Sequence, residues 1–214
     1  MRHLILSTLL VLTPTLAAAQ QIQFGPGWTE QRFSMFSSND YTLGGDTLQV
    51  RSDDTVSLLW SRLPETMWNN RRASWDWTVE RSVPATDLTR KGGDDRNMSL
   101  YFLFLPDEVA AKAKSAGVMS LLDNDDARVL IYVWGGAHDR GQILPTPYLG
   151  ERGRSLIRRS AGTGTASETV DLAADHRRAF GTEPGSLVGL AVSSDSDDTG
   201  TEVVARLSRL RIGK

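Results

Sequence analysis

The sequence contains no cysteine among its 214 residues. This absence excludes a disulfide framework, a thiolate metal site and a cysteine nucleophile. The chain also lacks a surplus of positive charge, because its 24 lysines and arginines are outnumbered by 26 aspartates and glutamates. Without such a surplus there is no counterion release to drive binding to nucleic acid, so we expect no nucleic-acid partner. Hydrophobic residues make up 40% of the chain, which is too many for a disordered protein of low net charge.

Long apolar runs are missing as well, and the one short run lies at the N-terminus. It extends from Leu4 to Leu12, follows Arg2 and ends before Pro14. The small residues Ala17–Ala19 come next, as signal peptidase requires. The run is too short to cross a bilayer, which takes about 20 apolar residues. We therefore predict a signal peptide over residues 1–19, a periplasmic or secreted protein over residues 20–214, and no transmembrane segment after cleavage.

The rest of the chain has the pattern of short strands separated by turns. Trp75, Trp77 and Val79 alternate with polar residues, which is typical of a half-buried antiparallel strand. Further strands are expected over residues 47–51, 56–63, 98–105, 129–134, 153–159, 168–172, 187–192 and 201–212. Glycine-rich turns and two short helices, at 107–115 and 173–180, lie between them. We predict one all-β domain over residues 20–214, an antiparallel β-sandwich of jelly-roll type.

Several short motifs, taken in order, resemble the bacterial domain of unknown function 3047. They are Trp75-Asp76-Trp77, Gly93-Asp94-Asp95-Arg96, Ile131-Tyr132-Val133-Trp134, Asp175 before Ala179-Phe180-Gly181, and Asp195-Ser196-Asp197-Asp198-Thr199. The chain departs from this family's pattern at His176 and Asp198, and near the end of the last strand. The resemblance implies a β-sandwich outside the cytoplasm and implies no activity.

An acidic loop, Asp195 to Gly200, follows the apolar strand at 187–192. Alternate oxygen-bearing side chains at Asp195, Asp197 and Thr199 suit a hard cation such as Ca²⁺. The loop is not an EF-hand, because Arg206 stands where a bidentate glutamate is required. The alternative is a solvated turn, since aspartate, threonine and glycine all favour turns. Calcium is the one cofactor for which the sequence gives grounds.

A pair of adjacent aspartates, Asp94 and Asp95, precedes Arg96 and a strongly apolar strand. Neighbouring strand residues point to opposite faces, so only one of the two carboxylates can face a ligand, with Arg96 orienting it. A local ion pair with Arg96 is the alternative. The residues alone do not decide which aspartate faces the ligand.

Aromatic side chains at the end of another strand offer a second part of a binding site. Tyr132 and Trp134 project to the same side, and glycines follow Trp134. An aromatic ring in this position can stack on the apolar C–H face of a sugar, while core packing is the alternative. Together with Asp175, which the family resemblance groups with these segments, they complete the predicted ligand-binding set of Asp94, Asp95, Arg96, Tyr132, Trp134 and Asp175.

These features favour a protein that binds carbohydrate or cell-envelope glycan without catalysis. There is no G-x-S-x-G elbow for a serine nucleophile. The acids Asp76 and Glu80 lie on one strand, roughly 13 Å apart, too far for a glycosidase pair. A carbohydrate-active hydrolase or lyase therefore requires carboxylates from separate strands, and this is the first alternative. A structural protein of the cell envelope is the second.

Overall fold

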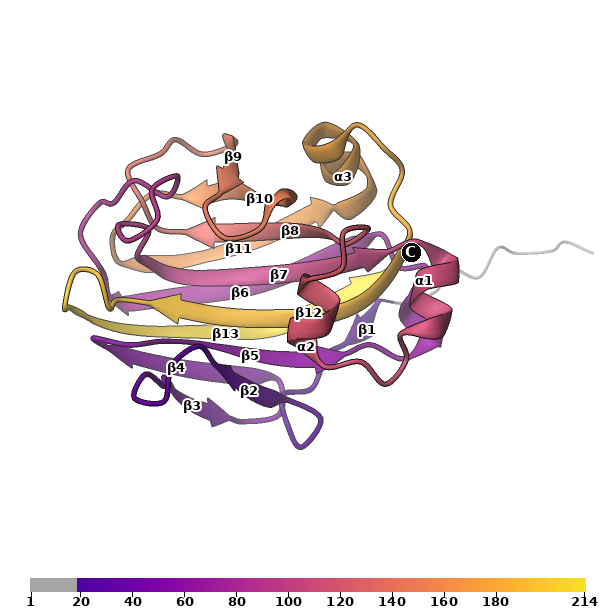
Figure 1. The fold of residues 1–214 in the computed structure, drawn as a ribbon. Helices are drawn as coiled ribbons and strands as arrows, with labels where there is room; N and C mark the ends of the chain where they lie inside the picture. The colour runs from indigo at the N-terminus through magenta and orange to yellow at the C-terminus, as the bar shows by residue number, and fades with distance from the viewer. Residues whose placement is uncertain (1–18) are drawn as a thin grey trace, which may run out of the picture.

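Two β-sheets packed face to face account for most of residues 19–214, the part of the chain that the computed structural model describes (Figure 1). The strands are β1 (Gln20–Gln21), β2 (Thr29–Arg32), β3 (Asp40–Leu43), β4 (Thr47–Asp53), β5 (Val56–Arg62), β6 (Arg72–Arg81), β7 (Arg96–Leu105), β8 (Arg128–Trp134), β9 (Ile143–Thr146), β10 (Gly150–Arg159), β11 (Gly164–Asp171), β12 (Ser186–Asp195) and β13 (Glu202–Gly213). The predicted β-sandwich of jelly-roll type is confirmed, because successive strands alternate between the sheets, with β4 and β6 in one and β5 and β7 in the other.

The six-stranded sheet is antiparallel throughout its described strands. Its order is β11-β6-β13-β4-β3, and β1 pairs with the end of β13. The seven-stranded sheet has the order β2-β5-β12-β7-β8-β10-β9. One pair in this second sheet departs from the expected antiparallel arrangement, since β8 and β10 run parallel, with Gly153 opposite Val129.

The hydrophobic core lies between the two sheets. Alternation along β6 points Trp75 and Trp77 inward, and each is at most 2% exposed. Trp75 packs on Phe102 of β7 and Tyr132 of β8, with ring centroids 6.3 and 5.4 Å apart. Fully burying one such aromatic side chain contributes about 1.5 to 3 kcal/mol, so this aromatic layer stabilises the packing of the two sheets.

The outer face of the seven-stranded sheet is also apolar, and short helices lie over it (Figure 1). Helix α1 (Asp107–Lys112) is shorter than the predicted helix at 107–115, and α2 (Val118–Leu122) was not expected from the sequence. Their buried residues Ala110 and Leu121 share a cluster with Val129 and Ile131 of β8. A single 3₁₀ turn (Glu65–Met67) is a further helical element of the described chain.

Helix α3 (Leu172–Phe180) matches the helix expected at 173–180 and contacts β6, β8 and β11. The Asp171 side chain accepts a hydrogen bond from the backbone N–H of Ala174 at 2.9 Å and caps its start. Gly181, with a φ of 75°, ends it in the left-handed conformation that favours glycine.

The predicted signal peptide falls outside the described residues except for Ala19, which directly precedes β1. Within residues 19–214, the helices are all too short and too polar to cross a membrane.

Candidate functional site

The acidic turn after β12 folds against the aspartate pair before β7. Asp95 is fully buried, and its carboxylate accepts hydrogen bonds from the backbone N–H of Thr199 at 2.7 Å, from the Thr199 hydroxyl at 2.5 Å and from the backbone N–H of Asp198 at 3.3 Å. Asp95 therefore anchors the turn, and this structural role uses both of its carboxylate oxygens.

Asp94 is the member of the pair that faces a pocket. Its Oδ2 accepts a hydrogen bond from Arg96 Nη1 at 2.9 Å, and its Oδ1 accepts one from the Tyr148 hydroxyl at 3.2 Å. The ion pair with Arg96, which the sequence offered as an alternative to ligand contact, is present. Asp94 is 3% exposed, so this contact is largely shielded from water.

Arg96 joins Asp94, in the loop before β7, to a second carboxylate on β12. The same Nη1 lies 3.1 Å from Oδ2 of Asp195, at the end of β12. The guanidinium also donates to the hydroxyls of Ser99 and Tyr101, at 2.9 and 3.2 Å. Four groups, from β7, from β12 and from the loop before β7, thus hold one arginine in a fixed position.

Asp195 has one carboxylate oxygen without a partner. Its Oδ1 is buried and makes no hydrogen bond within the described residues. Asp195 lines the pocket and is 6% exposed. Burial raises the pKa of Asp195 to about 8; nearby Arg96 opposes this shift, and the aspartates at 197, 95 and 94 add to it. Burial therefore favours the protonated form of Asp195, while the contact with Arg96 favours the charged form.

The pocket has a volume of about 410 Å³ and lies on the outer face of the seven-stranded sheet. We call it the acidic pocket. Its polar end holds Asp94, Arg96, Tyr101, Asp195, Asp197 and Asp198. Its walls are mainly apolar side chains, namely Phe33, Val56, Leu58, Leu88, Met119, Leu122, Ile131, Pro147, Tyr148 and Leu149. This size and combination are typical of small-molecule sites, where an apolar cavity holds a few convergent polar groups.

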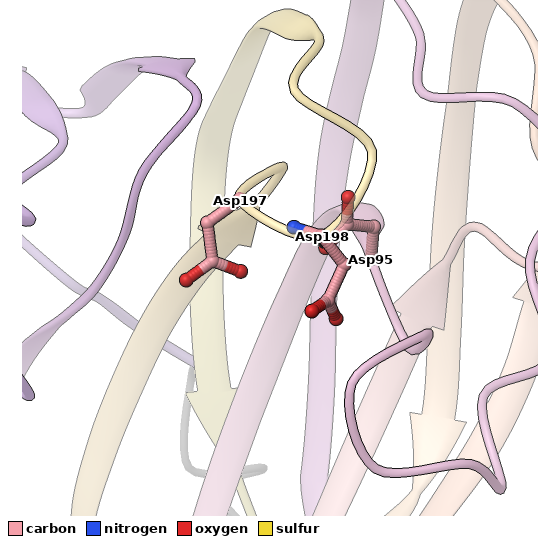
Figure 2. A group of neighbouring side chains, drawn as sticks. All are labelled: Asp95, Asp197 and Asp198. Atoms are coloured by element: carbon pink, nitrogen blue, oxygen red, sulfur yellow. Dashed lines mark hydrogen bonds between the residues drawn. The ribbon is translucent and has the colours of Figure 1, made fainter.

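The expected calcium ligands Asp195, Asp197 and Thr199 do not form a set. The Asp195 carboxylate pairs with Arg96, and the Thr199 hydroxyl donates to Asp95. Instead, carboxylate oxygens of Asp95, Asp197 and Asp198 lie within 4.8 Å of one another (Figure 2). The Asp95 carboxylate is already engaged by the turn, so this group fits Ca²⁺ poorly and we assign no cation to it.

Three other predicted ligand-binding residues lie elsewhere. Even-numbered residues of β8 face the opposite sheet, so Tyr132 is fully buried and Trp134 is 3% exposed. The Tyr132 hydroxyl donates to Asp175 Oδ2 at 2.8 Å, and Arg178 donates to Asp175 Oδ1 at 2.9 Å. The expectation of ligand contact at Tyr132 and Asp175 is corrected to a core hydrogen bond that fixes α3. Trp134 packs on Trp77 and does not line the acidic pocket.

Tyr101 and Tyr148 line the acidic pocket, and neither they nor the neighbouring Ser193 were predicted as site residues. Tyr101 and Ser193 face each other across β7 and β12, and their hydroxyl oxygens are 3.1 Å apart. A polar residue two positions before Asp195 on the same strand shares its face, so Ser193 carried a signal in its spacing. Tyr148 lies in the loop between β9 and β10, where no periodicity was available to place it.

We expect Asp195→Asn to stabilise the protein progressively as pH rises from about 4 to about 8. Because the folded pKa exceeds the unfolded value, the folded state holds a proton that the unfolded state has released, and wild-type stability falls over this interval. Urea denaturation across the interval should show a difference that is near zero at the acidic end. The difference should grow by up to about 1.4 kcal/mol per pH unit across the interval and level off above about pH 8. A gain that does not depend on pH, or one equalled by the exposed Asp139→Asn, would contradict this.

Comparison with known proteins gives one relationship in sequence and several weak ones in structure. The xyloglucanase domain of NopAA, a type three effector from Sinorhizobium fredii solved with cellobiose, is 9% identical with a TM-score of 0.44, covering 91% of this chain and 97% of that one. A loop-swap mutant of Neocallimastix patriciarum Xyn11A is 14% identical with a TM-score of 0.45, covering 92% and 97%. The family 11 xylanase from Neocallimastix patriciarum is 14% identical with a TM-score of 0.44, covering 87% and 91%.

No curated protein matches the chain in sequence. A family profile does match, over residues 26–211, which is nearly all of the described sandwich. It includes the aspartate pair, the acidic turn and every strand from β2 to β12. The chain belongs to the family described as "Protein of unknown function (DUF3047)".

Proposed function

We propose that this protein binds a carbohydrate in the acidic pocket without chemical change. The observation that carries the proposal is the buried, unpartnered Oδ1 of Asp195. A buried oxygen without a partner costs about 1 to 3 kcal/mol, and a ligand that supplies a hydrogen bond recovers this energy. Sugars present several hydroxyl groups close together, and each can donate to one carboxyl oxygen while accepting from a neighbouring donor.

The other groups at the polar end support the same ligand class. Asp94 offers a second acceptor beside Asp195, and Arg96 holds the two carboxylates at one nitrogen. The pocket walls include two half-exposed aromatic rings, Phe33 at 53% and Tyr148 at 55%. Such rings pack on the apolar C–H faces of a pyranose.

A glycan-binding screen followed by calorimetric titration tests the proposal. We expect Asp94→Asn and Tyr148→Ala each to weaken binding of the selected saccharide by about tenfold, because each removes one polar or one stacking contact. Phe36→Ala is the matched control, since Phe36 is 93% exposed and does not line the pocket. Absence of saccharide binding, or equal losses in the control, would overturn the assignment.

A second candidate function is hydrolysis of a glycosidic bond, and one observation favours it. Asp94, in the loop before β7, and Asp195, at the end of β12, contact the same nitrogen, and burial raises the pKa of Asp195 to about 8. A retaining glycosidase needs a protonated acid and a second carboxylate about 5 to 5.5 Å apart. Release of reducing ends from a bound oligosaccharide, lost in Asp195→Asn while binding persists, would support catalysis. Binding without any release would support the binding protein.

A further inference from the structure

A second hollow, which shares no lining residue with the acidic pocket, lies where β10 ends. It has a volume of about 350 Å³ and is lined by Trp134, Arg140, Arg158, Arg159 and the loop over residues 160–163. We call it the arginine hollow. Its lining contains three guanidinium groups and no carboxylate. Nothing in the carbohydrate proposal uses these residues.

One buried glutamate holds two of the arginines in place. The Glu168 side chain is fully buried and accepts hydrogen bonds from Arg140 at 3.0 and 2.8 Å and from Arg158 at 2.9 and 2.6 Å. Burial alone would raise the pKa of Glu168, but these arginines hold it below its ordinary value. The glutamate is therefore a charged anchor beneath the hollow, and it is not exposed to a ligand.

The third arginine is fixed by an aromatic ring. The Arg159 guanidinium lies over the Trp134 ring, 5.3 Å from its centroid, while its Nε is 3.8 Å from Glu168 Oε1. Trp134 is itself held by a hydrogen bond from its Nε1 to the Gly162 carbonyl at 3.1 Å. Cation–π contact of this kind orients a guanidinium and leaves its N–H edge free to donate.

The arginine hollow has more positive than negative charge. Three arginines and one glutamate leave two positive charges without a counterpart among these residues. The Arg140 and Arg159 side chains are 53% and 43% exposed, so both can reach a ligand. Guanidinium groups match the geometry of carboxylate, sulfate and phosphate, to which they donate two parallel hydrogen bonds.

We propose that the arginine hollow binds an oxyanion, carried either as a free inorganic ion or as an acidic group on a sugar. The anion contacts Arg159 and Arg140 at the open side, while Glu168 and Trp134 keep those arginines from rearranging. Preorganised donors of this kind bind with a smaller entropic cost than flexible surface side chains.

Titration with inorganic phosphate, inorganic sulfate and glucuronate, each at constant ionic strength and with glucose as the uncharged control, tests the site. We expect saturable binding of at least one anion, weakened about tenfold in Arg159→Gln and less in Arg159→Lys, which keeps the charge and loses the planar fork. Saturation by glucuronate alone assigns a sugar-borne carboxylate, and saturation by phosphate or sulfate assigns a free inorganic ion; both support the site.

Two matched variants make the test specific. Arg177→Gln removes a similarly exposed, ion-paired arginine away from the hollow and should leave the affinity unchanged. Asp94→Asn should also leave it unchanged, so failure of the carbohydrate proposal does not affect this test. No saturation by any of the three anions, or equal weakening in Arg159→Gln and Arg177→Gln, would overturn the proposal.

Discussion

Replacing Arg96 by methionine is expected to lower the free energy of unfolding by about 3 to 5 kcal/mol. Methionine keeps much of the apolar side chain but removes the charge between Asp94 and Asp195, which are 3% and 6% exposed. Two carboxyl groups would then remain buried without their cation, and the Ser99 and Tyr101 hydroxyls would lose a donor.

Denaturant unfolding at neutral pH measures this loss, with Arg177→Met as control. Arg177 is 49% exposed and pairs with the exposed Glu183, so its loss should cost less than about 1 kcal/mol. Adding Asp195→Asn to Arg96→Met should recover part of the loss, because one of the two unpaired acids is removed. Equal losses for Arg96→Met and Arg177→Met would show that Arg96 does not hold the acidic pocket together.

Glu168→Ala should cost about 3 to 5 kcal/mol, because it leaves Arg140 and Arg158 facing each other without their shared carboxylate. The pKa of Glu168 is lowered in the folded state, so its stabilising effect is present above about pH 4.5 and is lost as pH falls through the folded pKa. The difference between variant and wild type should therefore shrink in acid.

Thermal and denaturant unfolding at neutral and acidic pH check this result. The control is Glu151→Ala, because Glu151 is 93% exposed and pairs with Arg154 at the surface. We expect it to change stability by less than about 1 kcal/mol at either pH. A small effect of Glu168→Ala at neutral pH would mean that the arginines find other partners, and the hollow would then not be preorganised.

The sandwich was predictable because its strands carry clear local signals. The alternation through Trp75 and Trp77 identified an inward face, and the turn at Gly181 ended a helix where expected. Helix α2 was not predicted, because its five residues are too few to show a periodicity. The parallel pairing of β8 and β10 could not be predicted either, because no local pattern in the sequence specifies which strands pair or in which direction.

The candidate site was predictable only in some of its charged residues. Asp94, Arg96 and Asp195 stand out in the sequence, but no pattern showed that one arginine would contact both acids. The burial of Glu168 could have been predicted from its position in the sequence. It shares a strand face with Ala166 and Val170, which are both buried, so a glutamate at that position required a buried partner.

The single arginine between Asp94 and Asp195 has a consequence for the heat of binding. Because burial favours the protonated form of Asp195, we expect a neutral ligand to bind with nearly the same calorimetric enthalpy in phosphate and in Tris. A ligand that brings a positive charge favours the carboxylate form instead, so its measured enthalpy should change with the ionisation heat of the buffer.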